Sequence, residues 1–159
     1  MKYRLTKLLY EVILNESIDI YDLNKLKEST NYQIKKEDKE NFQVIFSPKE
    51  SPNKYQFKIE YDKDDMVMFG EFGIIQGDKI STTKQPKDKY VLNVLSTVFS
   101  LLRYYLDKYN IKKLKFEIEP GIKDELYNLY LKKHFNDYNI KTEGEYFLKE
   151  FTLVKKDGK

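Results

Sequence analysis

Apolar residues recur at helical spacing in two segments near the start of the chain. Residues 3–14 follow the i, i+3, i+4, i+7, i+8 pattern of one buried stripe, formed by Leu5, Leu8, Leu9, Val12 and Ile13. In residues 19–27 the apolar positions recur every three residues, which predicts a second, shorter helix. The polar and charged residues 30–41 are interpreted as an exposed connection.

Alternation of apolar and polar residues then predicts a meander of three strands. Residues 42–47 and 55–61 alternate cleanly, and residues 66–75 form the third strand. Short turns join these segments, so the strands should be antiparallel. Gly70 and Gly73 inside the third strand indicate a bulge or a close approach of the backbone.

Helices and strands alternate in the second half of the chain. After a polar loop over residues 77–89, residues 90–109 form the longest predicted helix, and its apolar residues on several sides favour packing against a sheet. The elements that follow are a strand, a helix and two strands, over residues 113–119, 122–135, 138–142 and 146–154. A strand–helix–strand unit within one sheet is a right-handed parallel crossover. We therefore expect one α/β domain over residues 1–159, with a mixed, mostly antiparallel sheet and helices on both faces.

Composition limits the classes of function. A chain of 159 residues with 40% hydrophobic and 15% aromatic residues is one ordinary domain with a real core. Lys and Arg number 29 against 26 Asp and Glu, and the net charge of +3 is too small for a dedicated nucleic-acid-binding protein. Lysines and tyrosines between residues 104 and 141 leave weak nucleic-acid binding as an alternative, although interleaved carboxylates favour a mixed solvated surface.

The compartment is indicated by what the sequence lacks. There is no cysteine, which excludes disulfides and thiolate zinc sites and fits a reducing environment. Charges within residues 1–14 exclude a signal peptide, and polar residues interrupt the apolar stretch 91–106, which therefore cannot span a bilayer. We expect a soluble, cytoplasmic protein. Richness in Lys, Ile, Asn and Tyr is typical of AT-rich genomes, including those of bacteria and phages.

No metal site is expected. His134 is the only histidine, and no carboxylates repeat at helical spacing around it. Asp62, Asp64 and Asp65 lack the later Gly and Glu of a calcium loop and are typical of a β-turn. The sequence also contains no phosphate loop, dinucleotide motif or nucleophile elbow.

The element order resembles the fold of the GNAT acyltransferases, in which a meander leads through a cofactor-contacting helix to a fifth strand, a fourth helix and a last hairpin. The best local match is residues 129–135, Leu-Tyr-Leu-Lys-Lys-His-Phe, which look like the family's Leu-Tyr-x-Lys-x-Gly-Phe ending of the fourth helix. His134 stands where glycine is usual. The resemblance covers about residues 42–154.

The resemblance implies an acetyl-CoA site at the start of the long helix. Family members carry Arg/Gln-x-x-Gly-x-Gly/Ala there, and backbone N–H groups at the helix N-terminus hold the pyrophosphate. Here Gln85 is in place, and Lys87 and Lys89 are the candidate anion-binding side chains. Asp88 and Tyr90 occupy the positions of the small residues.

The resemblance also implies catalytic residues. Tyr130 matches the tyrosine that protonates the leaving thiolate of CoA in many family members, against the alternative of an ordinary helix aromatic. Glu71 is a candidate base, against the alternative of a solvated strand residue. Ile74, on the same strand, is a candidate for backbone contact with the pantetheine arm. Lys123 replaces an asparagine that family members often carry.

Four departures from the family pattern, at Asp88, Tyr90, Lys123 and His134, favour a domain that keeps the fold for binding or assembly, such as a phage accessory protein. The alternative is an acetyl-CoA-dependent N-acyltransferase with a noncanonical cofactor loop. The predicted helix over residues 3–14 is a candidate docking element for a protein partner, or else the first helix of the fold packed on its own sheet.

Overall fold

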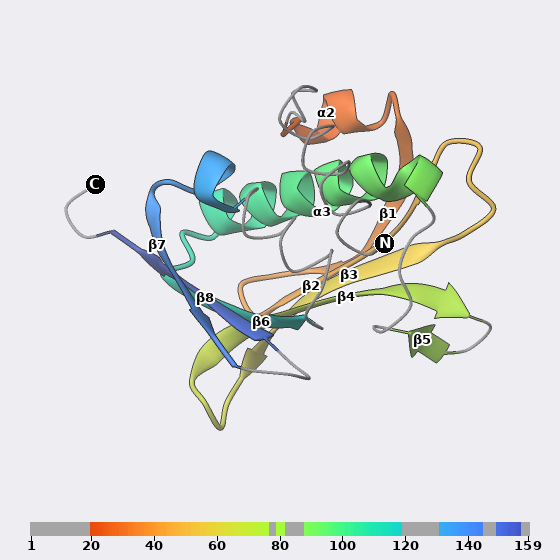
Figure 1. Ribbon diagram of the computed structural model, residues 1–159. Coiled ribbons are helices and arrows are strands. Elements are labelled where there is room, and N and C mark those ends of the chain that lie inside the picture. Colours follow the sequence, from red (N-terminus) through yellow and green to blue (C-terminus); the bar gives the residue numbers. More distant parts are fainter. Residues whose placement is uncertain (1–19, 77–78, 82–87, 119–130, 145–148, 157–159) are drawn as a thin grey trace, which may run out of the picture.

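A computed structural model describes residues 20–76, 79–81, 88–118, 131–144 and 149–156 (Figure 1). The named elements in this part are α2 (Leu23–Leu26), β1 (Thr30–Glu37), β2 (Asn41–Pro48), β3 (Tyr55–Asp62), β4 (Val67–Gln76), β5 (Lys79–Ser81), α3 (Asp88–Lys108), β6 (Lys113–Ile118), β7 (Tyr138–Glu143) and β8 (Lys149–Lys155). Residues 131–134 are also helical.

All the described strands belong to one sheet of eight strands. The order is β1-β2-β3-β4-β6-β8-β7, and β5 pairs with β4 outside this path. Every pairing is antiparallel except β4 with β6, which are joined through α3 as a parallel crossover. This confirms the predicted α/β class with a mixed, mostly antiparallel sheet.

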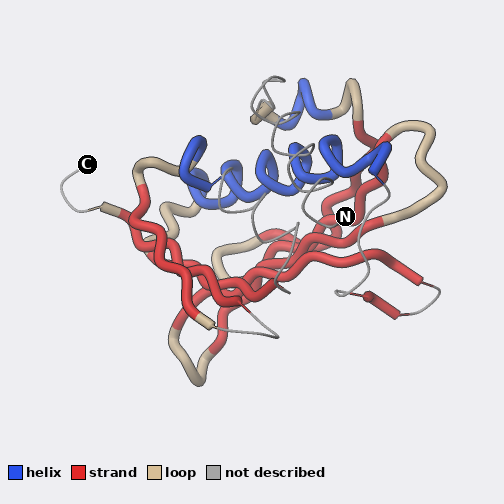
Figure 2. The backbone as a smooth tube through the Cα atoms, viewed as in Figure 1, coloured by secondary structure: helices blue, strands red, loops and turns tan. Residues whose placement is uncertain are grey.

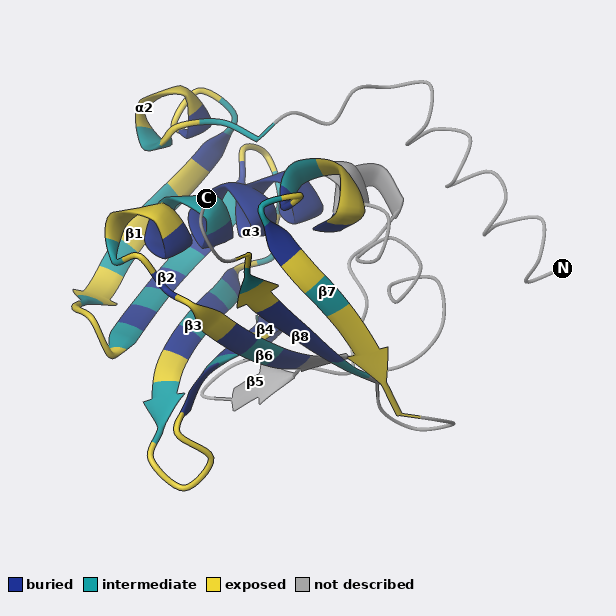
Figure 3. Cartoon of the chain, turned by 90° about the vertical axis from the view of Figure 1, so that its left-hand side faces the viewer, coloured by how far each residue is buried: buried dark blue, intermediate teal, exposed yellow. Residues whose placement is uncertain are grey.

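The meander has four strands, so the interpretation of residues 30–41 as an exposed connection is wrong. Thr30–Glu37 is β1, which lies at the edge of the sheet and shows its outer face to solvent (Figure 3). An edge strand needs only one apolar face, and a register shift between Ile34 and Lys36 interrupts even that alternation. The three-residue strand β5 lies within residues 77–89, which the sequence pattern predicted as a loop, so that prediction is also wrong for Lys79–Ser81.

The core lies between α3 and one face of the sheet (Figure 2). In-register rows of buried side chains cross the sheet, and one such row joins Val44, Phe57 and Phe72. The rings of Phe42 and Tyr105 stack with their centroids 4.9 Å apart. The period-2 pattern of β2 and β3 reflects this arrangement, because the residues that face α3 are buried and those between them are partly or fully exposed.

A stripe of small polar residues lines the outer side of α3, where α2 and the segment before it lie (Figure 1). The Thr30 and Thr97 hydroxyls lie 3.0 Å apart, and the Tyr21 backbone N–H donates to Ser100 Oγ at 3.0 Å. The described helices thus cover one face of the sheet. The helix predicted at residues 3–14 lies outside the described residues, as does most of that at 122–135, so helices on the second face stay a prediction.

The C-terminal hairpin places β8 between β6 and β7. Along β7 only Tyr138 is buried, and most of the other residues are exposed (Figure 3). The Tyr138 hydroxyl donates to the Ile111 carbonyl at 2.6 Å, which ties the hairpin to the chain after α3. In the part of the chain that the structure describes, no helix is long and apolar enough to cross a membrane.

Candidate functional site

The sheet splits between β4 and β6. Their parallel pairing ends where Gly70 meets Phe116, although β4 continues to Gln76 and β6 to Ile118. From Ile74 onward the freed edge of β4 pairs with β5. Among the described strands, residues 71–73 of β4 therefore have no partner on the side of β6. The split opens toward the end of the sheet where α3 begins (Figure 1), which is where the family resemblance places acetyl-CoA.

Two of the predicted site residues lie on β4 beside this split. Glu71 is the first residue beyond the last β4–β6 pair, is exposed, and is in register with Lys58 of β3. Ile74 is buried, with 4% exposure, between Tyr55 of β3 and Ser81 of β5. The structure thus brings Glu71 to the apex of the split, and places Ile74 where β5 covers the strand edge.

The bulge predicted at Gly70 and Gly73 is wrong. The register between β3 and β4 runs without interruption along the whole of both strands. A Cβ atom on Gly70 would lie 3.5 Å from Cβ of Phe116 and 4.0 Å from Cγ1 of Ile59, which is ordinary van der Waals contact. The split therefore does not arise from a bulge in β4.

The predicted cofactor loop is described only at its end. Helix α3 begins at Asp88, so this acidic residue lies in the first turn of the helix. Lys89 also belongs to α3, in the part of the helix whose side chains are not described. Gln85, Lys87 and Tyr130 lie outside the described residues, and their assigned roles stay predictions.

The end of the helix that would carry Tyr130 is fixed to α3. Leu131 and Phe135 are both fully buried, and the Phe135 ring lies 5.9 Å from that of Phe99. Arg103 of α3 lies over the Phe135 ring, with its guanidinium carbon 5.1 Å from the centroid. These contacts fix the described residues 131–135 against α3.

Arg103 forms an ionic cluster with Asp107 and Asp137, which we call the Arg103 cluster. The two terminal nitrogens of the Arg103 guanidinium each donate to one oxygen of Asp137 at 2.8 Å, and the Arg103 Nε donates to Asp107. The hydrogen bonds from Arg103 hold the pKa of Asp137 below its usual value. The cluster joins α3 to the start of the C-terminal hairpin, and both carboxylates are satisfied by it.

A second network, which we call the Glu37 cluster, consists of Glu37, Tyr104, Lys108 and Tyr109. The carboxylate accepts hydrogen bonds from the two tyrosine hydroxyls, at 2.9 Å and 2.7 Å, and from the Lys108 ammonium at 2.6 Å. Burial raises the pKa of Glu37, but the hydrogen bonds from Lys108, Tyr109 and Tyr104 outweigh burial and lower it.

The bulge in β1 explains how Glu37 reaches α3. Ile34 is in register with Val44, but Lys36 with Gln43 and Glu37 with Phe42, so Lys35 is the extra residue. In a regular strand Glu37 would face away from the helix, because side chains alternate between faces. Sequence reasoning missed this cluster because it assigned residues 30–41 to a connection.

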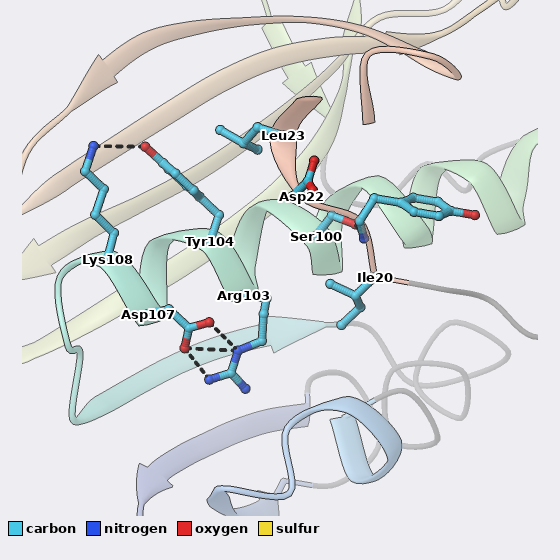
Figure 4. Close-up of a pocket in the computed structure, with 9 residues that line it drawn as sticks. Ile20, Asp22, Leu23, Ser100, Arg103, Tyr104, Asp107 and Lys108 are labelled. Atoms are coloured by element: carbon cyan, nitrogen blue, oxygen red, sulfur yellow. Dashed lines mark hydrogen bonds and ion pairs between the residues drawn. The ribbon is translucent and has the colours of Figure 1, made fainter. Parts of the chain in front are cut away.

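The outer face of α3 carries a groove of about 500 Å³, which we call the outer groove (Figure 4). One wall is the segment Ile20–Leu23 and the other is α3 from Ser100 to Lys108. A neighbouring hollow of about 470 Å³ shares Ile20, Tyr21 and Asp22 and extends to Lys25 and His134. Nothing in the sequence pattern indicated this feature, because its walls are about 80 residues apart, as shown by the Tyr21–Ser100 separation of 79.

The lysines considered for nucleic-acid binding are partly neutralised. Lys108 pairs with Glu37, Lys115 with Glu150 at 3.5 Å, and Lys141 with Glu143 at 2.6 Å. These pairs support the mixed, solvated surface that the interleaved carboxylates favoured.

Comparison with known proteins gives structural similarity without a match in sequence. The chain matches no protein-family model, and no curated protein matches its sequence. A crystal structure of a probable acetyltransferase superimposes with a TM-score of 0.44 at 10% identity, covering 73% of this chain and 62% of that protein. The match thus spans less than two thirds of that protein's length, and at this score and identity it assigns neither a family nor an activity.

Proposed function

We propose that this chain is a GNAT-like domain that acts by binding, as an accessory protein, and not as an acyl-CoA-dependent enzyme. The observation that carries the proposal is that α3 begins at Asp88. The resemblance aligns this position with the first glycine of the pyrophosphate loop. The chain is rich in Lys, Ile, Asn and Tyr, as is typical of proteins from AT-rich genomes, and it lacks cysteine. Both features support a phage or bacterial accessory protein of a reducing compartment.

A carboxylate in the first turn has two electrostatic effects. It stabilises the helix by about 0.3–1 kcal/mol, because the helix dipole is positive at this end. It also repels the anion that such an N-terminus would otherwise attract. Like charges roughly 4 Å apart repel by about 4 kcal/mol at an effective dielectric constant near 20, which corresponds to roughly a thousandfold in affinity. Tyr90 adds bulk two residues later.

The split of the sheet supports binding of another kind. Residues 71–73 present strand backbone groups that no described strand uses, and an extended chain can add to such an edge. The ligand we infer for the split is thus an extended, uncharged amide chain and not the diphosphate part of a nucleotide cofactor.

Calorimetry tests the proposal with two ligands, acetyl-CoA and S-acetylpantetheine, which lacks the diphosphate and should bind the natural chain and Asp88→Gly alike. The natural chain should give no heat with acetyl-CoA at millimolar concentration, and Asp88→Gly should gain affinity for it by roughly two to three powers of ten. Asp107→Gly, the same change near the other end of α3, is the matched control and should gain nothing. Micromolar binding of acetyl-CoA by the natural chain, or its turnover with an amine, would overturn the proposal.

The second candidate function is an acetyl-CoA-dependent N-acyltransferase, which the position of Glu71 at the apex of the split favours. A base there would take a proton from the attacking amine, and Tyr130 would protonate the thiolate. Glu71→Gln would then lower kcat and remove the acidic limb of the pH–rate profile. Full activity in that variant would exclude the role.

A further inference from the structure

The polar side chains that line the outer groove already have partners within the chain. Ser100 Oγ accepts from the Tyr21 backbone N–H and donates to the Ser96 carbonyl, and Asp22 Oδ1 accepts from the Lys25 backbone N–H. Arg103 is engaged in the Arg103 cluster and Lys108 in the Glu37 cluster. A small polar ligand would have to displace these contacts, so the groove does not fit one.

What the groove offers instead is partly exposed apolar surface. Ile20, Tyr21 and Leu23 lie on one wall, and the Tyr104 ring lies on the other (Figure 4). The rim carries charges of both signs, since Asp22 and the Asp107 side chain are exposed and the Lys108 side chain is 51% exposed. The matching occupant is an amphipathic segment with an apolar stripe and charged residues outside that stripe.

The chain itself supplies such a segment immediately before the groove. Residues 3–14 combine the five-residue apolar stripe with three charged residues outside it, Arg4, Lys7 and Glu11. Twelve residues are too few for a stable isolated helix, which forms only when its apolar face is covered. We propose that the outer groove is the docking site of the helix predicted over residues 3–14 of the same chain.

The tether makes docking within one molecule the favoured arrangement. Ile20 lines the groove, and only residues 15–19 separate it from the predicted helix. Five residues span at most roughly 18 Å, so the apolar stripe is confined to the neighbourhood of the groove. A short tether gives an effective concentration of the order of millimolar, well above that of a second copy in solution.

Paramagnetic relaxation in the full chain tests the proposal, because the sequence has no cysteine and a spin label can be placed at one chosen site. A label at Lys25→Cys, beside the groove, should broaden the amide resonances of residues 3–14. The same label at Asp64→Cys, in the β3–β4 turn, should leave them sharp. Two further variants separate the faces of the helix. Val12→Asn in the apolar stripe should weaken the broadening, whereas Glu11→Asn on the polar face should leave it unchanged.

Three results would overturn the proposal: sharp resonances of residues 3–14 with the Lys25→Cys label, broadening that Val12→Asn leaves unchanged, or broadening that Glu11→Asn weakens equally. Broadening seen only when spin-labelled and isotope-labelled chains are different molecules would also overturn it, because the groove would then receive a second copy. Urea unfolding of both asparagine variants shows that the domain itself stays folded.

Discussion

Replacing Glu37 with glutamine should destabilise the fold, because the carboxylate is the shared acceptor of the Glu37 cluster. Its side chain is only 15% exposed, and its oxygens accept from two hydroxyls and an ammonium group. A glutamine amide keeps one acceptor oxygen but turns an NH₂ group toward these donors. Hydrogen bonds to charged groups contribute about 1.5–3 kcal/mol each, and the exposed Lys108 can turn to water, so we expect a net loss of about 2 kcal/mol for Glu37→Gln. In a chain of 159 residues this lowers the thermal midpoint by roughly 4–8 °C.

The size of this loss should depend on pH. The lowered pKa of Glu37 means that its contribution to stability is complete above the ordinary carboxyl pKa of 4.5 and is lost as the pH falls through the folded-state pKa. The natural chain and Glu37→Gln should therefore differ fully near pH 7 and converge at about pH 3.

Urea unfolding followed by circular dichroism at both pH values measures this difference in the free energy of unfolding. Glu28→Gln makes the same chemical change at an exposed position and is the control. Equal stabilities of Glu37→Gln and the natural chain near pH 7 would refute the reasoning. A difference that stays constant down to about pH 3 would show that packing, and not the charge, is responsible.

Three further predictions address other contacts. A double-mutant cycle of Arg103→Met and Asp137→Asn should give a coupling energy of about 1 kcal/mol, since the pair is bidentate but partly exposed, and the coupling should shrink in high salt. Tyr138→Phe should lower the free energy of unfolding by about 1–3 kcal/mol, because it leaves the buried Ile111 carbonyl without its donor. Deleting Lys35 should remove the β1 bulge and keep Glu37 opposite Phe42, so the effect of Glu37→Gln should persist within about 0.5 kcal/mol in that background, as measured by urea unfolding.

The elements that the sequence predicted best are those with one face against the core. β2 and β3 alternate because α3 covers one side of each and solvent reaches the other, and both were placed within two residues of their bounds. β1 was not predicted, because it lies at the edge of the sheet and the alternation of its side chains is shifted by the extra residue Lys35. β5 is three residues long, which is too short for any periodic pattern.

The candidate site was predictable only where local sequence determines it. The hydrophobic pattern predicted the strand that carries Glu71 and also the long helix, whose start the structure places at Asp88 and the pattern at Tyr90. The roles that the resemblance assigns to residues there stay predictions. The Glu37 cluster joins residues 67 to 72 apart in sequence, and no local rule relates such positions. Lys108, Tyr104 and Tyr109 were visible as a basic aromatic group, but their common acceptor was not.

The candidate ligand site and the two ionic clusters lie toward opposite ends of helix α3, and this separation makes them independently testable. Asp88 lies at its N-terminus beside the split, whereas the Arg103 and Glu37 clusters and the wall of the outer groove lie in its last three turns. The helix is 21 residues long, so its ends are roughly 30 Å apart, and charges at that distance are screened from each other at physiological salt. A substitution at Asp88 should therefore change ligand binding without weakening the clusters, and Glu37→Gln should lower stability without restoring affinity for acetyl-CoA. If Glu37→Gln did alter binding at the split, the helix would have to move as a unit, and the electrostatic account of Asp88 would no longer suffice.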